Sequence, residues 1–248
     1  MSMDATSTTI AEAAAPVAPA PAGGALAPAT EPVVARTSRV TDAACRALDI
    51  VVAATLLVAL LPLFAVLAIA IRLDSRGRAV FRQRRVGHHQ REFTLNKFRT
   101  MWADAGHDNH RAFVEKLIAG EHAHDDEGKK PFYKIERDPR VTRVGHFLRK
   151  SSLDELPQLW NVLVGEMSLV GPRPPLEYEV AKYPPHWFGR FAVKPGVTGL
   201  WQVNGRSELT LEEMIRLDIS YAERRSFWLN ISILFRTIPA VLWAKGAA

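Results

Sequence analysis

Cysteine is almost absent from this chain, and so are the features of a secretory signal. Cys45 is the only cysteine among 248 residues, so no intramolecular disulfide can form, which fits a reducing compartment. The first 20 residues contain neither Lys nor Arg and no long aliphatic block, whereas a signal peptide needs a basic start followed by an apolar core. The sequence therefore predicts that the N-terminal segment is retained in the cytoplasm.

Regular apolar periodicity is also missing from the first 36 residues. Ala, Pro and Thr dominate this segment. Such a composition cannot bury enough apolar surface to offset the entropy lost on folding. We therefore predict a disordered Ala/Pro-rich tail over residues 1–40.

The whole chain has the composition of a globular protein with a moderate positive charge. Hydrophobic residues make up 48% and charged residues 23%, enough to bury a core in one domain or two. The formal net charge of +6 favours anionic partners, namely nucleic acid, phospholipid headgroups or a phosphorylated substrate. Charge alone does not choose among the three.

Charge is absent from the run of residues between Ile50 and Ile71. At about 1.5 Å per residue, a straight helix over this run would be roughly 33 Å long, which is enough to span a bilayer. Pro62 lies at the centre of the run, where it removes a backbone hydrogen bond and kinks or breaks the helix. The sequence therefore predicts two helical halves rather than one straight span.

Basic residues flank this run on both sides. They are Arg36, Arg39 and Arg46 before it, and Arg72, Arg76, Arg78, Arg82, Arg84 and Arg85 after it. The positive-inside rule keeps both flanks in the cytoplasm. A re-entrant membrane helix over residues 41–73 satisfies both the proline and the charges. A kinked spanning helix stays open as an alternative, and a core helix of a soluble protein is the weakest one.

Two short strands are predicted directly after the run. Val80 to Val86 and the stretch around Phe93 and Leu95 have strand patterns, with a turn from Gly87 to Arg91 between them. The arginines from 72 to 85 are best explained as a basic face beside an anionic membrane, where each cation contributes about 1 kcal/mol. That explanation suits Lys97 and Arg99 less well, because they lie among apolar residues.

Residues 103–130 contain four of the eight histidines. His122, His124 and Asp125 resemble a cluster of metal ligands. The segment also has a helical pattern from Phe113 through Leu117, followed by a polar stretch. We favour a solvent-exposed helix and connector here, with a metal site as the alternative.

An acidic pair lies at the predicted start of a helix. Pro157 is tolerated only near a helix start and Asp154 is a favoured N-cap type, so the sequence predicts a helix from about Glu155 to Val164 that stops at Gly165. The positive end of the helix dipole would favour the ionised forms of both carboxylates. Because neighbouring side chains in a first turn diverge, one carboxylate suits a nucleophile and the other a ligand for a divalent cation.

Cations lie close to the acidic pair in the sequence. Arg149 and Lys150 precede it, and Arg173 lies between two prolines that fix the backbone on each side. A carboxylate that attacks a diphosphate must overcome electrostatic repulsion, which guanidinium groups and Mg²⁺ offset. Each residue alone is explained by a helix cap or a surface turn. Their grouping beside a membrane segment favours chemistry.

The C-terminal stretch from Trp228 to Trp243 is apolar, with tryptophans at both ends. Asn230, Arg236 and Pro239 interrupt it, so a membrane span is not predicted. We favour an interfacial amphipathic helix with its tryptophans at headgroup depth. A core helix is the alternative.

Six short motifs carry a resemblance to a known family. In order they are FRQRRVG from Phe81, KFRTM from Lys97, DPRVT from Asp138, LRKSSLDELPQ from Leu148, GPRP from Gly171 and KPGVTG from Lys194. The sequence resembles the bacterial sugar transferases known as monotopic phosphoglycosyl transferases, or undecaprenyl-phosphate hexose-1-phosphate transferases. The resemblance implies an α/β fold, with the re-entrant helix followed by a compact catalytic domain over residues 74–248. It also implies amphipathic interfacial helices that hold this domain on the cytoplasmic face of the inner membrane.

The family's mechanism maps onto residues already singled out. By this resemblance, Asp154 would attack the β-phosphate of a UDP-hexose and release UMP, and undecaprenyl phosphate would then take the sugar phosphate from the aspartyl intermediate. Glu155 would hold Mg²⁺, while Arg149 and Arg173 would bind phosphoryl oxygens. Further candidates for substrate contact, from residue type and motif position, are Lys97, Arg99, Arg140, Gln158, Gln202 and Arg206.

A membrane-tethered, non-enzymatic binder of an anionic polymer is the alternative function. Asp154 and Glu155 argue against it, because two carboxylates beside a basic cluster would repel a polyanion unless a metal or covalent chemistry is involved. Membrane lipid, UDP-hexose and undecaprenyl phosphate are therefore the expected partners, and nucleic acid is not. The resemblance leans toward exopolysaccharide enzymes that use UDP-glucose or UDP-galactose. The sugar itself and a homo-oligomeric state are left open.

Overall fold

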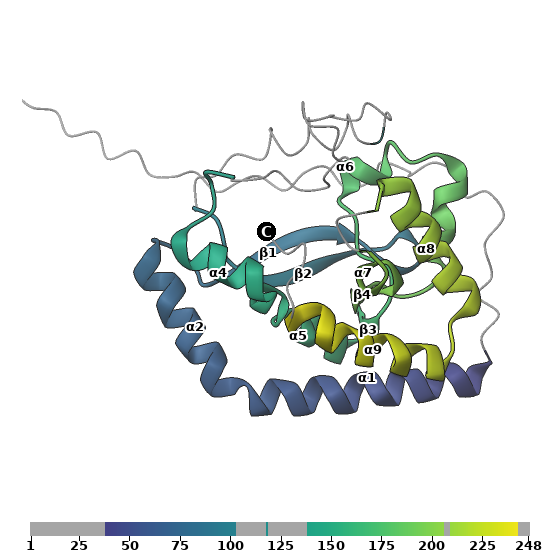
Figure 1. Cartoon of the computed structure of the whole chain (residues 1–248), viewed down its shortest axis with the longest axis horizontal. Helices are drawn as coiled ribbons and strands as arrows, with labels where there is room; N and C mark the ends of the chain where they lie inside the picture. The colour runs from purple at the N-terminus through teal and green to yellow at the C-terminus, as the bar shows by residue number, and fades with distance from the viewer. Residues whose placement is uncertain (1–37, 103–117, 119–137, 206–208, 243–248) are drawn as a thin grey trace, which may run out of the picture.

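The chain folds as a mixture of helices and short strands (Figure 1). A computed structural model of the protein describes residues 38–102, 118, 138–205 and 209–242. The predicted tail up to residue 37, nearly all of the histidine-rich segment and Arg206 lie outside this range. The elements are α1 (Arg39–Ala59), α2 (Leu61–Asp74), β1 (Val80–Val86), η1 (His88–Gln90), β2 (Glu92–Phe98), α4 (Arg143–Ser151), η2 (Leu153–Glu155), α5 (Gln158–Val164), β3 (Ser168–Val170), α6 (Glu177–Val180), η3 (Pro185–Ala192), β4 (Gly196–Thr198), α7 (Leu200–Val203), α8 (Leu211–Arg224) and α9 (Phe227–Leu242).

The apolar run forms two helices that meet at a sharp bend. α1 and α2 are bent by 62° across Leu60. Pro62 lies in the first turn of α2, where its missing N–H would have no helical partner in any case. Among the described helices none alone is long and apolar enough to cross a bilayer, whereas this bent pair together meets that requirement. The predicted helix, break and helix are confirmed, and their place in a membrane stays a prediction.

Polar residues of α1 attach this helix to the rest of the chain. Arg46 donates hydrogen bonds to the carbonyls of Val162 and Leu163 in the last turn of α5, at 2.6 and 2.8 Å. Asp49 is buried and accepts a hydrogen bond of 2.9 Å from the backbone N–H of Leu169 in β3. One face of α1 is therefore fixed to α5 and β3. In Figure 1, α1 runs along the lower edge of the molecule.

Two small sheets form the strand content of the described chain. β1 and β2 pair antiparallel, with Val80 opposite Phe98. The turn between them contains His89 and Gln90, with positive φ angles of 52° and 60°. The two predicted strands and the turn between them are therefore confirmed, and the two strands form a hairpin. β3 and β4 pair parallel, with Ser168 opposite Gly196.

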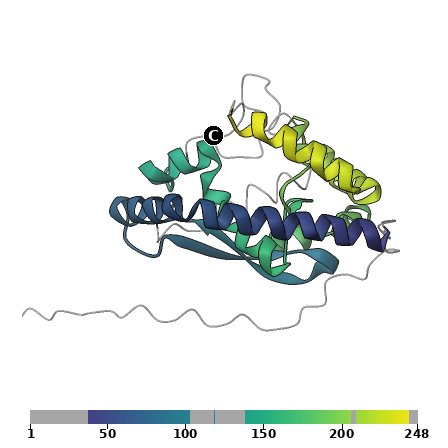
Figure 2. The same ribbon diagram turned by 90° about the horizontal axis from the view of Figure 1, so that it is seen from below.

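The main core lies where α1, α5, β3 and α9 meet. Figure 2 shows α9 running beside α1, in agreement with the contacts between them. The buried residues of this core include Ala53, Leu95, Leu159, Val162, Met167, Leu169, Val170, Val193, Tyr221 and Ile233. A second cluster joins η3, α6 and α8, and a third joins α2 to α4. The acidic pair, Asp154 and Glu155, thus lies in the sequence between α4, which belongs to the third cluster, and α5, which belongs to the main core.

The C-terminal helix has two different faces. Asn230 and Ile233 are buried against the core, whereas Trp228, Phe235 and Ile238 are exposed, Trp228 to 76%. Both sequence interpretations therefore describe part of α9: one face belongs to the core, and the other is apolar and exposed, as an interfacial helix requires.

A buried ion pair joins η3 to α8. Arg190 Nη2 donates to Asp218 Oδ2 at 2.6 Å, and the two side chains are only 5% and 1% exposed. Burial raises the pKa of Asp218 to about 6, although the charge of Arg190 opposes the shift. The carboxylate is therefore ionised at neutral pH, at a cost in stability.

We expect this pair to make stability depend on pH. The folded-state pKa of about 6 exceeds the ordinary 3.8, so the folded chain binds the proton more tightly. Asp218 therefore contributes most to the free energy of unfolding below about pH 4, and this contribution is lost as the pH rises through about 6. The loss is at most about 3 kcal/mol, since one pKa unit is about 1.4 kcal/mol. The unfolding temperature of the detergent-solubilised protein, measured at a series of pH values between about 4 and about 6, follows this loss of stability.

The matched control is a double variant, Arg190→Met with Asp218→Leu, which removes both charges. It should lack this decline in stability between about pH 4 and about pH 6. An equal pH dependence in the two proteins would contradict the assignment to Asp218.

Candidate active site

The acidic pair lies in a 3-10 turn and not at a helix N-cap. α4 ends at Ser151, its C-cap residue Ser152 has a φ of 57°, and η2 follows directly. α5 begins only at Gln158, with Pro157 as its N-cap residue and no side-chain cap. The predicted helix start at about Glu155, with Asp154 as the N-cap, is therefore wrong, because the pair lies in a separate 3-10 turn that follows the left-handed Ser152. The predicted end at Gly165 is confirmed.

Asp154 is a buried carboxylate without hydrogen-bond donors in the described part of the chain. Its exposed fraction is 8%, and the adjacent Glu155 side chain is 23% exposed. Burial raises the pKa of Asp154, while Lys97, Arg149 and Arg173 oppose the shift. The expectation that a helix dipole favours its ionised form is thus wrong in direction. Loss of water dominates because Asp154 does not lie at the end of a regular helix.

Three cations from separate elements surround the acidic pair. Lys97 Nζ of β2 lies 3.7 Å from Glu155 Oε1, and Arg173 Nη1 lies 3.9 Å from the same oxygen. Arg149 of α4 acts electrostatically on Asp154. Desolvation lowers the pKa of both Lys97 and Arg149, so these charges share the low-dielectric site. Three cations against two carboxylates leave an excess positive charge, which suits a bound phosphate.

One small cavity brings together five residues singled out in the sequence. They are Lys97, Glu155, Gln158, Arg173 and Gln202. Arg85, Leu95, Pro174, Gly196 and Val197 complete its lining. All the sequence motifs except DPRVT, which begins at Asp138, therefore contribute to the lining of one cavity.

Arg140 lies beside Arg149 and is held by a carboxylate. Its Nε and Nη2 donate to the two carboxylate oxygens of Asp138 at 2.8 and 2.7 Å. This ion pair lowers the pKa of Asp138. Arg149 in turn donates from Nε to Thr100 Oγ1 at 3.0 Å, which orients its guanidinium. Contact of Arg140 with a substrate stays a prediction.

Arg99 supports the end of α2. Its buried guanidinium donates to the carbonyls of Ser75 at 2.6 Å and Arg76 at 2.7 Å, and to Ser75 Oγ at 2.9 Å. β2 ends at Phe98, so Arg99 does not continue the strand face that carries Lys97. These contacts show a structural role for Arg99, and its contact with a substrate stays a prediction.

Residues 171–175, which we call the arginine loop, are fixed by donors from other elements. Each carbonyl of residues 172–175 accepts a hydrogen bond from a different donor. Two donors are main-chain groups: Gly196 N donates to Pro172 at 2.9 Å, and Val86 N donates to Pro175 at 3.0 Å. The other two are arginine side chains: Arg190 Nη2 donates to Arg173 at 2.8 Å, and Arg85 Nη1 donates to Pro174 at 3.1 Å. These roles of Arg85 and Arg190 were not predicted from the sequence. Arg85 was grouped with the basic face, and no motif marked Arg190.

Comparison with known proteins identifies the family of this chain. The sequence profile of the bacterial sugar transferase family matches residues 40–244. The chain belongs to the bacterial sugar transferase family. The resemblance inferred from the motifs is thereby confirmed, and membership of a transferase family favours an enzymatic function over the non-enzymatic alternative.

Three relatives illustrate the range of similarity. The chain is 42% identical over 202 residues to the UDP-galactose-lipid carrier transferase of Erwinia amylovora, covering 82% of this chain and 41% of that protein. It is 40% identical, with the same coverage, to the undecaprenyl-phosphate galactose phosphotransferase of Salmonella typhimurium. It is 37% identical to the exopolysaccharide production protein ExoY of Sinorhizobium fredii, covering 82% of this chain and 87% of ExoY. The match thus spans about two fifths of the first two relatives and most of the third.

We expect Arg99→Ala to destabilise the fold without touching the acidic pair. It leaves a buried acceptor at Ser75 and a partly buried acceptor at Arg76 without their donor, which costs roughly 2–4 kcal/mol. The unfolding temperature in detergent measures the loss. Lys150→Ala, which removes an exposed cation of α4, is the control and should leave stability within about 0.5 kcal/mol. An unchanged unfolding temperature for Arg99→Ala would refute the structural role.

Proposed function

We propose that this protein transfers a hexose 1-phosphate from a UDP-hexose to undecaprenyl phosphate through a phosphosugar-aspartyl intermediate. The observation that carries the proposal is Asp154, a buried carboxylate that accepts no hydrogen bond from the described residues and lies among three cations. The names of the relatives support the substrate class, since they specify undecaprenyl phosphate, galactose and exopolysaccharide production. The product would initiate the assembly of a surface glycan.

The first step forms the covalent intermediate. A carboxylate oxygen of Asp154 bonds to the β-phosphorus of the UDP-hexose, while the bond from that phosphorus to the bridging oxygen breaks and UMP leaves. Burial keeps the carboxylate poorly hydrated and therefore reactive. Arg149, Arg173 and Lys97 offset the repulsion between the carboxylate and the diphosphate.

The second step regenerates the enzyme. An oxygen of undecaprenyl phosphate bonds to the phosphorus of the aspartyl intermediate, the acyl phosphate bond breaks, and the Asp154 carboxylate is restored. The product is undecaprenyl diphosphate hexose. Because both steps place a phosphate beside the same carboxylate, the same cations serve both.

The site fits a divalent cation that arrives with the substrate. Glu155 Oε1 lies 3.7 and 3.9 Å from its two cationic neighbours, beyond hydrogen-bond distance, so its lone pairs are available. Among the described residues no group of three or more His, Cys, Asp or Glu forms a closed metal cage. Mg²⁺ is commonly held by one or two carboxylates together with substrate phosphates. Glu155 would hold it there, and the ion would neutralise charge on the diphosphate.

The exposed apolar residues of the bent helix pair support a site at a membrane surface. α2 exposes Leu61, Val66, Ile69 and Leu73. We propose that α1 and α2 enter one leaflet of the cytoplasmic membrane and return to the same side, with the exposed apolar face of α9 at the interface. This placement brings the acidic pair to the membrane surface, where the polyprenyl acceptor is held.

We expect Asp154→Asn to abolish UMP release. Purified wild-type protein with Mg²⁺, undecaprenyl phosphate and UDP-glucose or UDP-galactose should release UMP, and the variant should be slower by about 1,000-fold or more, because an amide is a poor nucleophile. Glu223→Gln, which alters an exposed carboxylate of α8, is the control and should retain activity. Labelled phosphosugar should be trapped on the wild-type protein without acceptor and not on Asp154→Asn. Normal release by that variant would rule out the nucleophile.

We also expect both ends of the bent helix pair to lie in the cytoplasm. Single cysteines at Ser38 and Arg91, in a Cys45→Ser background, flank α1 and α2 at exposed positions. A membrane-impermeant maleimide should label both in inverted membrane vesicles and neither in intact spheroplasts. Labelling of the two positions from opposite sides would establish a spanning helix instead of a re-entrant one.

A further inference from the structure

We propose that Arg190, held by Asp218, is a positioning residue that fixes the main chain at Arg173 and so directs the Arg173 guanidinium toward the acidic pair. The inference rests on the proposed function, since the reaction is what the positioning serves. It assigns a role in the transfer to two side chains that lie on the far side of the arginine loop from the carboxylates.

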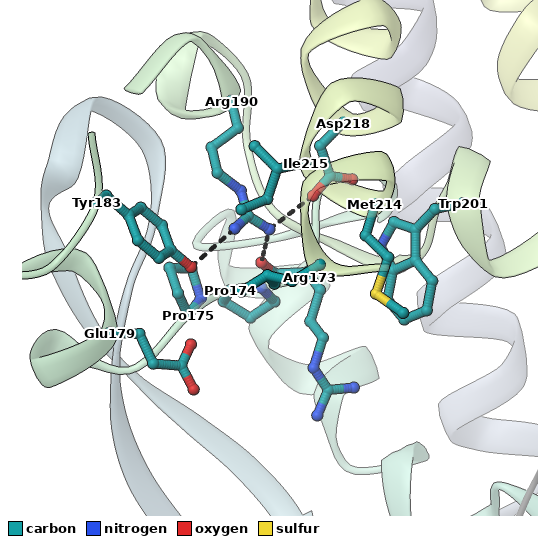
Figure 3. Close-up of a pocket in the computed structure, with 11 residues that line it drawn as sticks. Arg173, Pro174, Pro175, Glu179, Tyr183, Arg190, Trp201, Met214, Ile215 and Asp218 are labelled. Atoms are coloured by element: carbon teal, nitrogen blue, oxygen red, sulfur yellow. Dashed lines mark hydrogen bonds and ion pairs between the residues drawn. The ribbon is translucent and has the colours of Figure 1, made fainter. Parts of the chain in front are cut away.

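The contacts of Arg190 converge on the arginine loop (Figure 3). Its Nη2 donates to the carbonyl of Arg173 at 2.8 Å and to Asp218 Oδ2 at 2.6 Å, and its Nη1 donates to the hydroxyl of Tyr183 at 3.0 Å. Figure 3 shows the Arg173 side chain pointing away from Arg190. Arg190 therefore acts on Arg173 through the main chain, whereas Arg173 Nη1 reaches to within 3.9 Å of Glu155 Oε1.

The arginine loop needs such a donor from outside. Pro172, Pro174 and Pro175 have no N–H, so this segment cannot form a regular ladder with a neighbouring strand. The carbonyl of Arg173 is directly bonded to the Cα that carries the functional side chain, and rotation of this peptide would displace the guanidinium. A displacement of about 1 Å at a positioned group can cost about 100-fold in rate.

Asp218 is needed because the charge of Arg190 is buried. A guanidinium that is 5% exposed requires a counter-ion, and Asp218 is the carboxylate at 2.6 Å that supplies it. A fork with two donating nitrogens can hold Asp218, the Arg173 carbonyl and Tyr183 at once, which an ammonium group in the same place cannot do with the same geometry. The pair also joins η3 to α8, so a purely structural role is the competing explanation.

The double variant Arg190→Met with Asp218→Leu separates the two explanations. It removes the donor to Arg173 but leaves no unpaired buried charge, and such apolar replacements are often neutral or stabilising. We expect the variant to fold with an unfolding temperature close to that of the wild type, because removal of the buried charges offsets the loss of the donor to the Arg173 carbonyl. We also expect a fall of about 10-fold to 100-fold in kcat for UMP release and a much smaller change in KM for the UDP-hexose. Tyr183→Phe, which keeps both bonds of Nη2, is the matched control and should stay within about two-fold of the wild type.

A second pair of variants tests whether Arg190 acts through Arg173. Arg190→Lys keeps the charge beside Asp218 and should lower kcat in the wild-type background. In an Arg173→Lys background, Arg190→Lys should lower kcat much less, because the Arg173 guanidinium that Arg190 positions is already absent. This comparison remains decisive if the double variant fails to fold.

The possible outcomes test the positioning role of Arg190 separately from the proposed transferase function. A wild-type protein that releases no UMP would overturn the proposed function. An active wild type with an equally active double variant, or with equal fold losses for Arg190→Lys in both backgrounds, would overturn the positioning role and leave the function standing. A stable double variant with low kcat and a non-additive Arg190→Lys effect supports the proposal.

Discussion

A carboxylate that is removed from water must be surrounded by fixed positive charge, and much of this fold meets that requirement at Asp154. The compensating cations come from β2, α4 and the arginine loop, three parts of the chain that are far apart in the sequence. None of them makes a hydrogen bond to the carboxylate among the described contacts, so the charge is balanced at a distance while the oxygens stay available. The hairpin, the short helices and the buried ion pair can all be understood as supports that hold these three charges in place.

Buried or half-buried arginines that donate to main-chain carbonyls are the recurring support. Arg46 binds the last turn of α5, Arg99 binds the end of α2, and Arg190 and Arg85 bind the arginine loop. In each place the chain leaves a regular element or contains prolines, so carbonyls there can accept from donors outside the element. Arginine suits these places because a single planar group offers several donors with fixed directions. Part of the net charge of +6 is therefore structural.

The sequence predicted the parts of the molecule that depend on local patterns. The two strands with their turn, a break in the apolar run near Pro62 and the end of α5 at Gly165 follow from periodicity and from proline and glycine positions. Sequence reasoning also singled out five residues that line one cavity. The predicted start of α5 was wrong because a cap rule does not detect the left-handed Ser152 and the 3-10 turn that follows it. The support of α2 by Arg99 and the role of Arg190 were missed because they depend on Ser75 and Asp218, 24 and 28 residues away. The first error thus concerns a local backbone conformation, and the other two concern contacts that only the tertiary fold defines.

The same helix that would enter the membrane also helps to build the site. Arg46 and Asp49 lie on the face of α1 that contacts α5 and β3, while Val51 and Val58 are exposed on another part of its surface. β3 ends at Val170, immediately before the arginine loop, and α5 begins at Gln158, shortly after the acidic pair. The attachment points of α1 are thus close in sequence to both halves of the site. Because these contacts are hydrogen bonds to main-chain groups, they resist sliding of the helix along the domain. The depth of α1 in a bilayer would therefore set the height of the carboxylates above it, which is the geometric condition for a reaction between a soluble donor and a lipid acceptor.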